Sequence, residues 1–327
     1  MKNITLSFTS FVFTLICLEV IFRMVGLINP ELNQGAFYDT YSGEPPNHYY
    51  NFGVHDTIVF KSQNEFEYSS ITNNYGFFDR SFPEAFDDKT IIVFGDSYTQ
   101  GVGADSTETW PRYLQQCLNE NNNQWSVFNC GIAGCDPIFN FVVFRDLILS
   151  KKPEHVMLCI NETDVWDLIS RGGMERFRKD GTVRYKSPSF KYRLFRSSYL
   201  FRYGCINLLN YNYLGMTDAE TENSIKQAKI VLQNLVQEFS SLAFKNGIEF
   251  TLITMPFPTP PIPATANETS MNFQVSPSIH TIDLFSYFNE DSVIQNIDSY
   301  YWKNDGHFTA LGYLTFANGV CAQINAN

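Results

Sequence analysis

The sequence has few positive charges. Its 327 residues contain 23 Lys and Arg against 34 Asp and Glu, which gives a formal net charge of −11 at pH 7. Because nucleic-acid binding relies on basic surfaces that displace counterions from phosphates, this balance argues against a nucleic-acid partner. The sequence also has no zinc-ligand spacing, no helix-turn-helix signature and no internal repeat. These absences leave an ordinary globular composition, with 44% hydrophobic residues.

Cysteines are present without any repeated spacing. Several stand inside apolar runs such as VMLCI, so we expect mainly free, buried thiols. If the catalytic part of the chain is exported, one pair can be oxidised, and the spacing does not say which. The seven are Cys17, Cys117, Cys130, Cys135, Cys159, Cys205 and Cys321.

The first 29 residues form an apolar segment. It is apolar up to Leu18, is interrupted by Glu19 and Arg23, and continues apolar to Leu27. Counted to Leu27 it is long enough to cross a bilayer, whereas counted to Leu18 it is nearer to a signal-peptide core. No small-x-small cleavage site follows, which favours a retained membrane anchor over a cleaved signal, with a buried core helix as the third reading. Lys2 supports an orientation that places the rest of the chain outside the cytoplasm.

The rest of the chain divides into a lead-in segment and an α/β domain. Residues 30–87 are mixed polar and aromatic, with strands within 57–70, and we expect them to pack on the main domain. Between 88 and 327, continuous apolar strands alternate with helices, as a parallel sheet covered on both faces requires. The predicted strands are 90–97, 125–132, 154–160, 248–256 and 281–285. The predicted helices are 108–120, 137–150, 221–246 and one after Thr309.

A basic, aromatic insertion at about 166–220 interrupts this alternation. One reading is a solvated insertion held by aromatic anchors. The other is a basic rim that binds an acidic polysaccharide or an anionic bilayer surface. Ten of the 23 basic residues lie here: Arg171, Arg176, Arg178, Lys179, Arg184, Lys186, Lys191, Arg193, Arg196 and Arg202.

Ser97 is a candidate nucleophile because GDSYTQG directly follows an apolar strand. A serine nucleophile needs a histidine within hydrogen-bond reach. Only His307, in KNDGHFTALGY, stands between a strand and a helix, where Thr309 can cap the helix and Asp305 is close by. The other four histidines lie in the lead-in segment or at the wrong ends of strands: His48, His55, His155 and His280.

An acyl-transfer site also needs donors for the oxyanion. The backbone N–H of Ser97 is one candidate, if the Gly95–Ser97 turn opens a helix. A backbone N–H at Gly134 is a second, since glycine allows close approach of the chain. A side chain from residues 161–163 is the third. All these loops follow strands of the predicted sheet, so we expect them at one edge.

Four blocks in order resemble those of the SGNH (GDSL-type) hydrolase superfamily. They are GDSYTQG, NCGIAGC, INETDV and DGHFTALGY, each at the expected end of a strand. The apolar N-terminus with EVIFR, and NNYGFFDR before the domain, resemble the membrane-anchored bacterial branch of that superfamily. The likeness covers residues 90–327 apart from the insertion.

This resemblance implies a flavodoxin-like three-layer α/β/α sandwich and ester hydrolysis or acyl transfer without a metal or cofactor. It implies Ser97 as nucleophile, His307 as base and Gly134 as an oxyanion donor. Location at the membrane, in the bacterial periplasm or at the cell surface, follows from the anchored branch. The implied substrate is an acylated small molecule or polysaccharide.

Two blocks depart from the family pattern. In the family, the third block usually reads Gly-x-Asn-Asp, and the asparagine side-chain amide donates to the oxyanion. When INETDV is aligned on Asp164, Thr163 takes the place of that asparagine. Asn161 reaches the oxyanion only if the loop bulges. The family's acid usually stands three residues before the histidine, where this chain has Asn304. Asp305 stands two before, a spacing shared by relatives that acetylate exopolysaccharides. The alternative is a Ser97–His307 dyad with a backbone carbonyl holding the ring.

Three functions fit these observations. The first is a membrane-tethered serine esterase that removes acyl groups, most simply acetyl, from carbohydrate or cell-envelope material. The second is an O-acyltransferase that uses the same acyl-enzyme with a sugar hydroxyl as acceptor. The third is a non-catalytic polysaccharide-binding protein; the altered INETDV block supports it, and the intact Ser97 and His307 oppose it.

We further expect Asp96 and Asp164 to brace loops.

Overall fold

The structure is a computed structural model of the chain. The residues it describes are 2–25, 40–42, 53–62, 64–120, 123–178, 182–184, 189–212, 214–257, 262–263, 265–266, 269 and 271–325. Parts of the predicted anchor and lead-in segments, together with Lys179 and Lys186 of the insertion, lie outside these residues.

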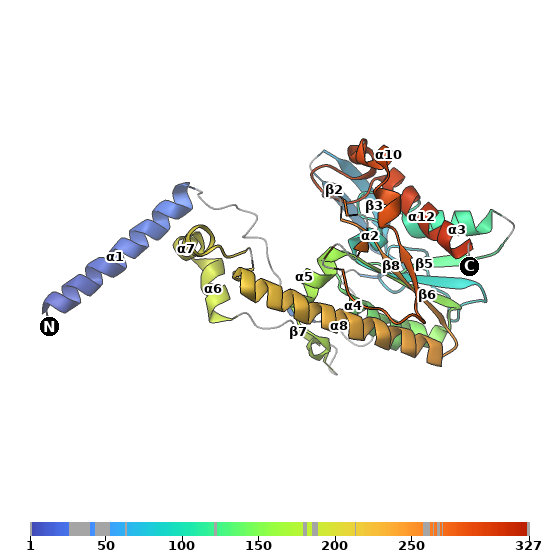
Figure 1. Cartoon of the computed structure of the whole chain (residues 1–327), viewed down its shortest axis with the longest axis horizontal. Helices are drawn as coiled ribbons and strands as arrows, with labels where there is room; N and C mark the ends of the chain where they lie inside the picture. Colours follow the sequence, from blue (N-terminus) through green and yellow to red (C-terminus); the bar gives the residue numbers. More distant parts are fainter. Residues whose placement is uncertain are drawn as a thin grey trace.

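A five-stranded parallel sheet forms the centre of the main domain (Figure 1). Its strand order is β5-β4-β6-β8-β9, and every neighbouring pair is parallel. Numbered within the sheet, this order is 2-1-3-4-5, which is the order of the flavodoxin-like fold that the resemblance implied. Every residue of β4 and β6 is buried, as expected for strands covered on both faces. The bounds are β4 Thr90–Phe94, β5 Ser126–Asn129, β6 His155–Ile160, β8 Glu249–Thr254 and β9 His280–Asp283.

Helices cover both faces of this sheet. One face packs against α4, α5 and α8, with the Phe94 and Phe239 ring centroids 5.7 Å apart. The other packs against α3 and α12, with Trp110 and Phe316 4.7 Å apart. The fold is therefore a three-layer α/β/α sandwich. The main helices are α2 Ser97–Gln100, α3 Trp110–Asn119, α4 Pro137–Val143, α5 Glu162–Arg171, α8 Asp218–Lys245 and α12 Ala310–Asn325, with short α9 Phe285–Phe288, α10 Asp291–Ile294 and α11 Ile297–Tyr300.

The predicted helix over 137–150 is continuous but irregular. After α4 the chain passes into a π-helical turn, Phe144–Ile148, and then a 3-10 turn, Leu149–Lys151. A second 3-10 turn, Met174–Arg176, follows α5.

The remaining described elements lie around the sandwich. An antiparallel hairpin, β2 with β3, comes from the lead-in segment, and β1 pairs with β7. Helices α6 and α7 of the insertion extend towards α1, which projects from the domain (Figure 1). The bounds are α1 Lys2–Val25, β1 Thr40–Ser42, β2 Thr57–Ser62, β3 Phe66–Ile71, β7 Thr182–Arg184, α6 Phe190–Ser197 and α7 Tyr199–Leu209.

The insertion is not uniformly solvated. Arg176 is 3% exposed and pairs with the buried Asp136 at 2.5 Å, and Arg202 is fully buried and donates to the carbonyl oxygen of Phe195 at 2.9 Å. Both readings of the insertion treated its basic side chains as a surface feature, which is wrong for Arg176 and Arg202. Each of them helps to fold the segment.

Candidate active site

The turn after β4 presents Ser97 at the carboxyl edge of the sheet. Asp96 caps α2 by accepting a hydrogen bond from the backbone N–H of Tyr98 at 2.9 Å. Asp96 and Tyr98 are buried, whereas Ser97 between them is partly exposed. Ser97 is the first residue of the helix, so its backbone N–H has no acceptor within the helix. The local sequence therefore places both the hydroxyl and the amide of Ser97 at the edge of the sheet.

His307 meets Ser97 from the far end of the chain. Its Nε2 lies 2.7 Å from Ser97 Oγ. The Tyr98 ring lies 4.9 Å from the imidazole, and the Tyr98 hydroxyl donates to the carbonyl oxygen of Gly306 at 3.0 Å. The backbone N–H of Gly312 donates to the Thr309 hydroxyl at 3.3 Å, so Thr309 caps α12 as predicted. These contacts fix the loop that presents the ring.

Asp305 holds the other nitrogen of the same ring. Its Oδ1 lies 2.5 Å from His307 Nδ1, and both side chains are about one-fifth exposed. The hydrogen bond with His307 lowers the pKa of Asp305 below its usual value, although burial opposes this. An ionised Asp305 can only accept, so Nδ1 carries the proton and Nε2 accepts from Ser97. The three side chains are thus bonded in the order of a Ser–His–Asp triad.

The loop after β5 lies against the nucleophile turn. The N–H of Ile132 donates to the carbonyl oxygen of Gly95 at 3.2 Å, and the N–H of Ala133 donates to Gln100 Oε1 at 2.7 Å. A Cβ on Gly131 would stand 2.3 Å from the backbone nitrogen of Gln100, so this contact requires glycine. Gly134 is exposed and has φ +74°, which also favours glycine.

In the loop after β6, which contains INETDV, the side chains of Asn161 and Thr163 make different hydrogen bonds. Asn161 caps α5: its Oδ1 accepts from the Thr163 N–H at 2.8 Å, and its Nδ2 donates to Asp96 Oδ2 at 2.8 Å. The Thr163 hydroxyl lies 2.7 Å from Asn161 Oδ1 and 3.3 Å from Asp96 Oδ2. The single proton of that hydroxyl is therefore engaged within the loop. The Asn161 amide has a second proton besides the one given to Asp96.

Asp164 and Asp167 add carboxylates behind this loop. Asp164 accepts from the Asn161 N–H at 2.8 Å, which braces the turn as predicted. Burial raises the pKa of Asp164 well above its usual value, and burial raises that of Asp167 to about 7 despite an ion pair with Arg171 at 3.2 Å. Arg171 also donates to the carbonyl oxygen of Gly134. In the part of the chain that the structure describes, no three His, Cys, Asp or Glu side chains are grouped to hold a metal ion.

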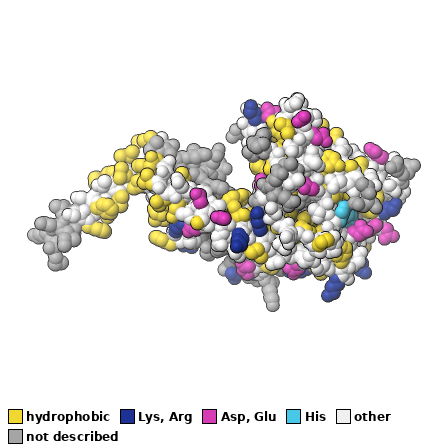
Figure 2. Space-filling view, viewed as in Figure 1, with side chains coloured by type: hydrophobic (Ala, Val, Ile, Leu, Met, Phe, Trp, Pro, Cys, Tyr) yellow, Lys and Arg dark blue, Asp and Glu magenta, His cyan; other side chains and the backbone are white. Residues whose placement is uncertain are grey.

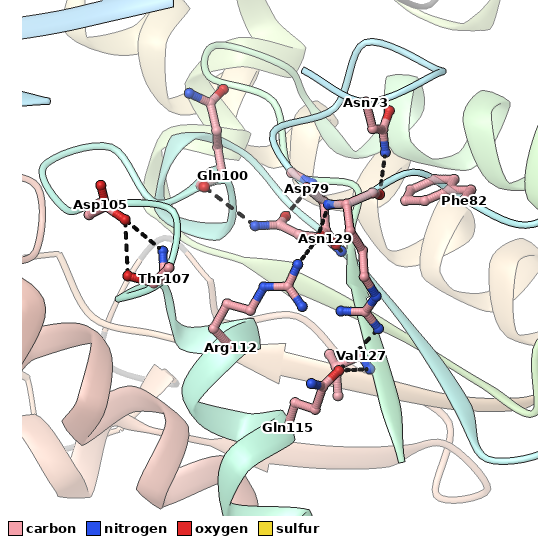
Figure 3. A network of polar contacts seen from close by, with 12 residues as sticks. Asn73, Asp79, Phe82, Gln100, Asp105, Thr107, Arg112, Gln115, Val127 and Asn129 are labelled. Atoms are coloured by element: carbon pink, nitrogen blue, oxygen red, sulfur yellow. Dashed lines mark hydrogen bonds and ion pairs between the residues drawn. The ribbon is translucent and has the colours of Figure 1, made fainter. Parts of the chain in front are cut away.

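A buried polar network ties the lead-in segment to these loops (Figure 3). Asp79 accepts from the backbone N–H of Asn129 at 2.6 Å and from the Arg112 guanidinium. Asn129 Nδ2 in turn donates to the carbonyl oxygens of Thr99 at 2.7 Å and Gln100 at 3.3 Å. The network thereby holds α2 against the end of β5. The sequence predicted no role for Asp79 or Asn129, although Asp79 lies in NNYGFFDR and Asn129 in NCGIAGC.

Comparisons with known proteins give similarities in structure alone. No family model and no curated protein matches the sequence. Similar solved structures include the acetyl xylan esterase AlAXEase (16% identity, 72% of this chain and 99% of that chain, TM-score 0.43). Others are esterase EstA from Pseudoalteromonas sp. (15%, 73% and 98%, 0.41) and a putative lipolytic protein of the G-D-S-L family from Desulfitobacterium hafniense DCB-2 (14%, 72% and 99%, 0.41). None of these similarities assigns an activity to this chain, so its chemistry has to follow from the site.

Proposed function

We propose that this protein is a serine esterase of the SGNH type that hydrolyses acyl esters through an acyl-enzyme on Ser97. The observation that supports this most is the relay of two hydrogen bonds, 2.7 Å from Ser97 to His307 and 2.5 Å from His307 to Asp305. It stands at the edge of a parallel sheet where such sites gather. Independent motifs more than 200 residues apart meet in it.

In this mechanism His307 acts as the base. Nε2 takes the Ser97 proton as Oγ attacks the ester carbonyl carbon, and Asp305 stabilises the imidazolium that forms. The tetrahedral intermediate collapses, the bond to the alcohol breaks, and His307 returns the proton to the leaving oxygen. Water then attacks the acyl-enzyme with His307 again as base, which releases the acid and restores Ser97.

Three donors are proposed for the oxyanion. They are the backbone N–H groups of Ser97 and Gly134 and the second amide proton of Asn161. Thr163 is the weaker candidate because its hydroxyl proton is engaged within the loop. In this proposal the asparagine donates from the cap position of α5.

We assign the substrate to acetyl esters on carbohydrate or cell-envelope material. The disulfide between Cys117 and Cys321 supports a location outside the cytoplasm, because disulfides persist in oxidising compartments, and cell-envelope material lies there. An O-acyltransferase with the same acyl-enzyme is the alternative, favoured by the two-residue spacing from Asp305 to His307. Adding sugar acceptors separates the two, since a transferase moves the acyl group to the sugar in preference to water.

The N-terminal helix is proposed to be a retained anchor. Ser7–Val25 has a mean hydropathy of 1.9 and none of it is buried; its hydrophobic side chains lie on the surface (Figure 2). Glu19 accepts hydrogen bonds from Ser198 Oγ at 2.8 Å and from the N–H groups of Tyr199 and Leu200 at 2.9 Å each. The two polar residues that interrupt the apolar run, Glu19 and Arg23, are thus both used at the junction of α6 and α7. A signal that is cleaved has no need of such a fit.

Hydrolysis of a p-nitrophenyl ester series, from acetate to long acyl chains, tests the proposed activity. The full-length protein in detergent is compared with its Ser97→Ala variant. We expect turnover that prefers short chains and falls by at least about a thousandfold in the variant, since the nucleophile is lost. Equal turnover in both proteins would contradict the proposal, and a preference for long chains would contradict the acetyl assignment.

A further inference from the structure

The tip of the β2–β3 hairpin lies against the loop that holds the triad's acid and base. The hairpin comes from the lead-in segment, and its two strands pair from Thr57 and Ile71 to Ser62 and Phe66. In Figure 1 it stands beside α2, and the Tyr68 hydroxyl accepts from the backbone N–H of Gly103 at 3.3 Å just after that helix.

Glu65, in the hairpin turn, accepts hydrogen bonds from the backbone N–H groups of Asn304 and Asp305. Its Oε2 accepts from the N–H of Asp305 at 2.9 Å. Its Oε1 accepts from the N–H of Asn304 at 2.8 Å and from Asn304 Nδ2 at 3.0 Å. Hydrogen bonds from backbone amides to a carboxylate are among the stronger ones in proteins. One side chain therefore binds the N–H groups of two successive residues, Asn304 and Asp305, in the loop that leads to His307.

Neighbouring residues of the hairpin support the same loop. The Ser62 side chain, at the end of β2, helps to lower the pKa of the Asp305 carboxyl. Phe66 packs on Trp302 with ring centroids 5.7 Å apart, and Trp302 Nε1 donates to the carbonyl oxygen of Gly103 at 2.8 Å. The hairpin thus contacts both the acid loop and the chain just after the nucleophile helix.

We propose that Glu65 is a positioning residue for the triad: it holds the loop of Asp305 and His307 so that the aspartate meets the ring from two residues away. The inference rests on the proposed serine chemistry. In this arrangement the lead-in segment completes the active site of the domain that follows it. Without Glu65, the Asn304 and Asp305 amides turn to water and the carboxylate of Asp305 loses its fixed angle to Nδ1.

Glu67 provides a matched control. It lies two residues further along the same hairpin, where its side chain is 59% exposed and pairs with Lys61 across the two strands. Truncating it removes the same charge and the same number of atoms without touching the acid loop. A general effect of the hairpin's charge or stability would appear equally in both variants.

The test is the rate at which a fluorophosphonate labels Ser97 in the full-length protein. We expect Glu65→Ala to slow labelling about tenfold or more, since small displacements of catalytic groups have effects of this order. Glu65→Gln keeps one acceptor and should fall between Glu65→Ala and the wild type. The labelling rate of Glu67→Ala should remain within about twofold of the wild-type rate, because this change displaces no catalytic group.

A double-mutant cycle with Asp305→Ala identifies how Glu65 acts. If Glu65 works through Asp305, then Glu65→Ala has almost no further effect in a chain that already lacks Asp305. An equal loss in both backgrounds, or a loss equal to that of Glu67→Ala, would overturn the inference. A wild type whose Ser97 is not labelled at all would instead reject the proposed function, so the two failures are distinguishable.

Discussion

Among the single residues of the proposed site, Asn161 has the most demanding position, because in the proposed mechanism one amide caps a helix, binds Asp96 and donates to the oxyanion. The cap uses Oδ1 and the bond to Asp96 uses one proton of Nδ2. Only the remaining proton can serve catalysis. Thr163 beside it keeps its hydroxyl on Asn161 and Asp96.

We expect Asn161→Ser to lower kcat on p-nitrophenyl acetate by about 100-fold or more, because removing one oxyanion donor has an effect of this size. Serine keeps the helix cap, so the fold should be retained. Thr163→Val is the matched control and should lose less than about tenfold, because it keeps all three donors. A larger loss for Thr163→Val than for Asn161→Ser would reverse the assignment of the donor.

Ser97, His307 and Asp305 could be predicted from the sequence, whereas Glu65 could not. The first three stand in blocks whose order and placement at strand ends are visible along the chain. Glu65 stands 240 residues before Asp305, in a stretch where the sequence predicts strands but not what they contact, so nothing local indicates the contact. The same holds for Asp79, which reaches Asn129 only once the lead-in loop has folded onto the sheet.

Among the elements, α5 gathers carboxylates close to the proposed oxyanion site. Burial raises the pKa of Asp167 on this helix to about 7, while its side chain is only 15% exposed. Because the folded chain holds this proton more tightly than the unfolded chain, the contribution to stability is present at low pH. It is lost as the pH rises towards 7.

Asp167→Asn should remove this pH dependence. Asparagine keeps an acceptor for Arg171 and has no charge to bury. We expect the free energy of unfolding of the variant, relative to the wild type, to increase by about 3 kcal/mol between about pH 5 and pH 8. The size follows because about two pH units of this interval lie below the pKa of Asp167 in the folded chain, and each unit contributes about 1.4 kcal/mol. Urea unfolding of both proteins at the two pH values measures this. A difference that does not change with pH would contradict the assigned titration.

For the whole molecule, the strands of the central sheet and the main helices that cover it were predicted from the sequence, and the resemblance implied the flavodoxin-like arrangement. The contacts between distant segments were not predicted. The disulfide joins α3 to α12 across 204 residues of sequence, with Cα atoms 6.5 Å apart. Those helices are neighbours only because both cover the same face of the sheet. The other five cysteines are free, as expected for thiols in apolar runs.

Likewise, in the sequence the two charged residues within the N-terminal apolar run, Glu19 and Arg23, interrupt a predicted membrane segment. Their partners lie about 180 residues away, at the junction of α6 and α7. A pattern along the chain shows which face of a helix is apolar. It does not show which other segment will satisfy a charge on that face.

The central claim is that Ser97 carries the acyl group during turnover. The most direct measurement is mass spectrometry of peptides from the full-length protein, quenched in acid during hydrolysis of p-nitrophenyl acetate. We predict an acetyl group on the peptide containing Ser97, bound at that residue, and none in the Ser97→Ala variant. Release of p-nitrophenol with no acetyl group on Ser97, or with the group on another residue, would contradict the account.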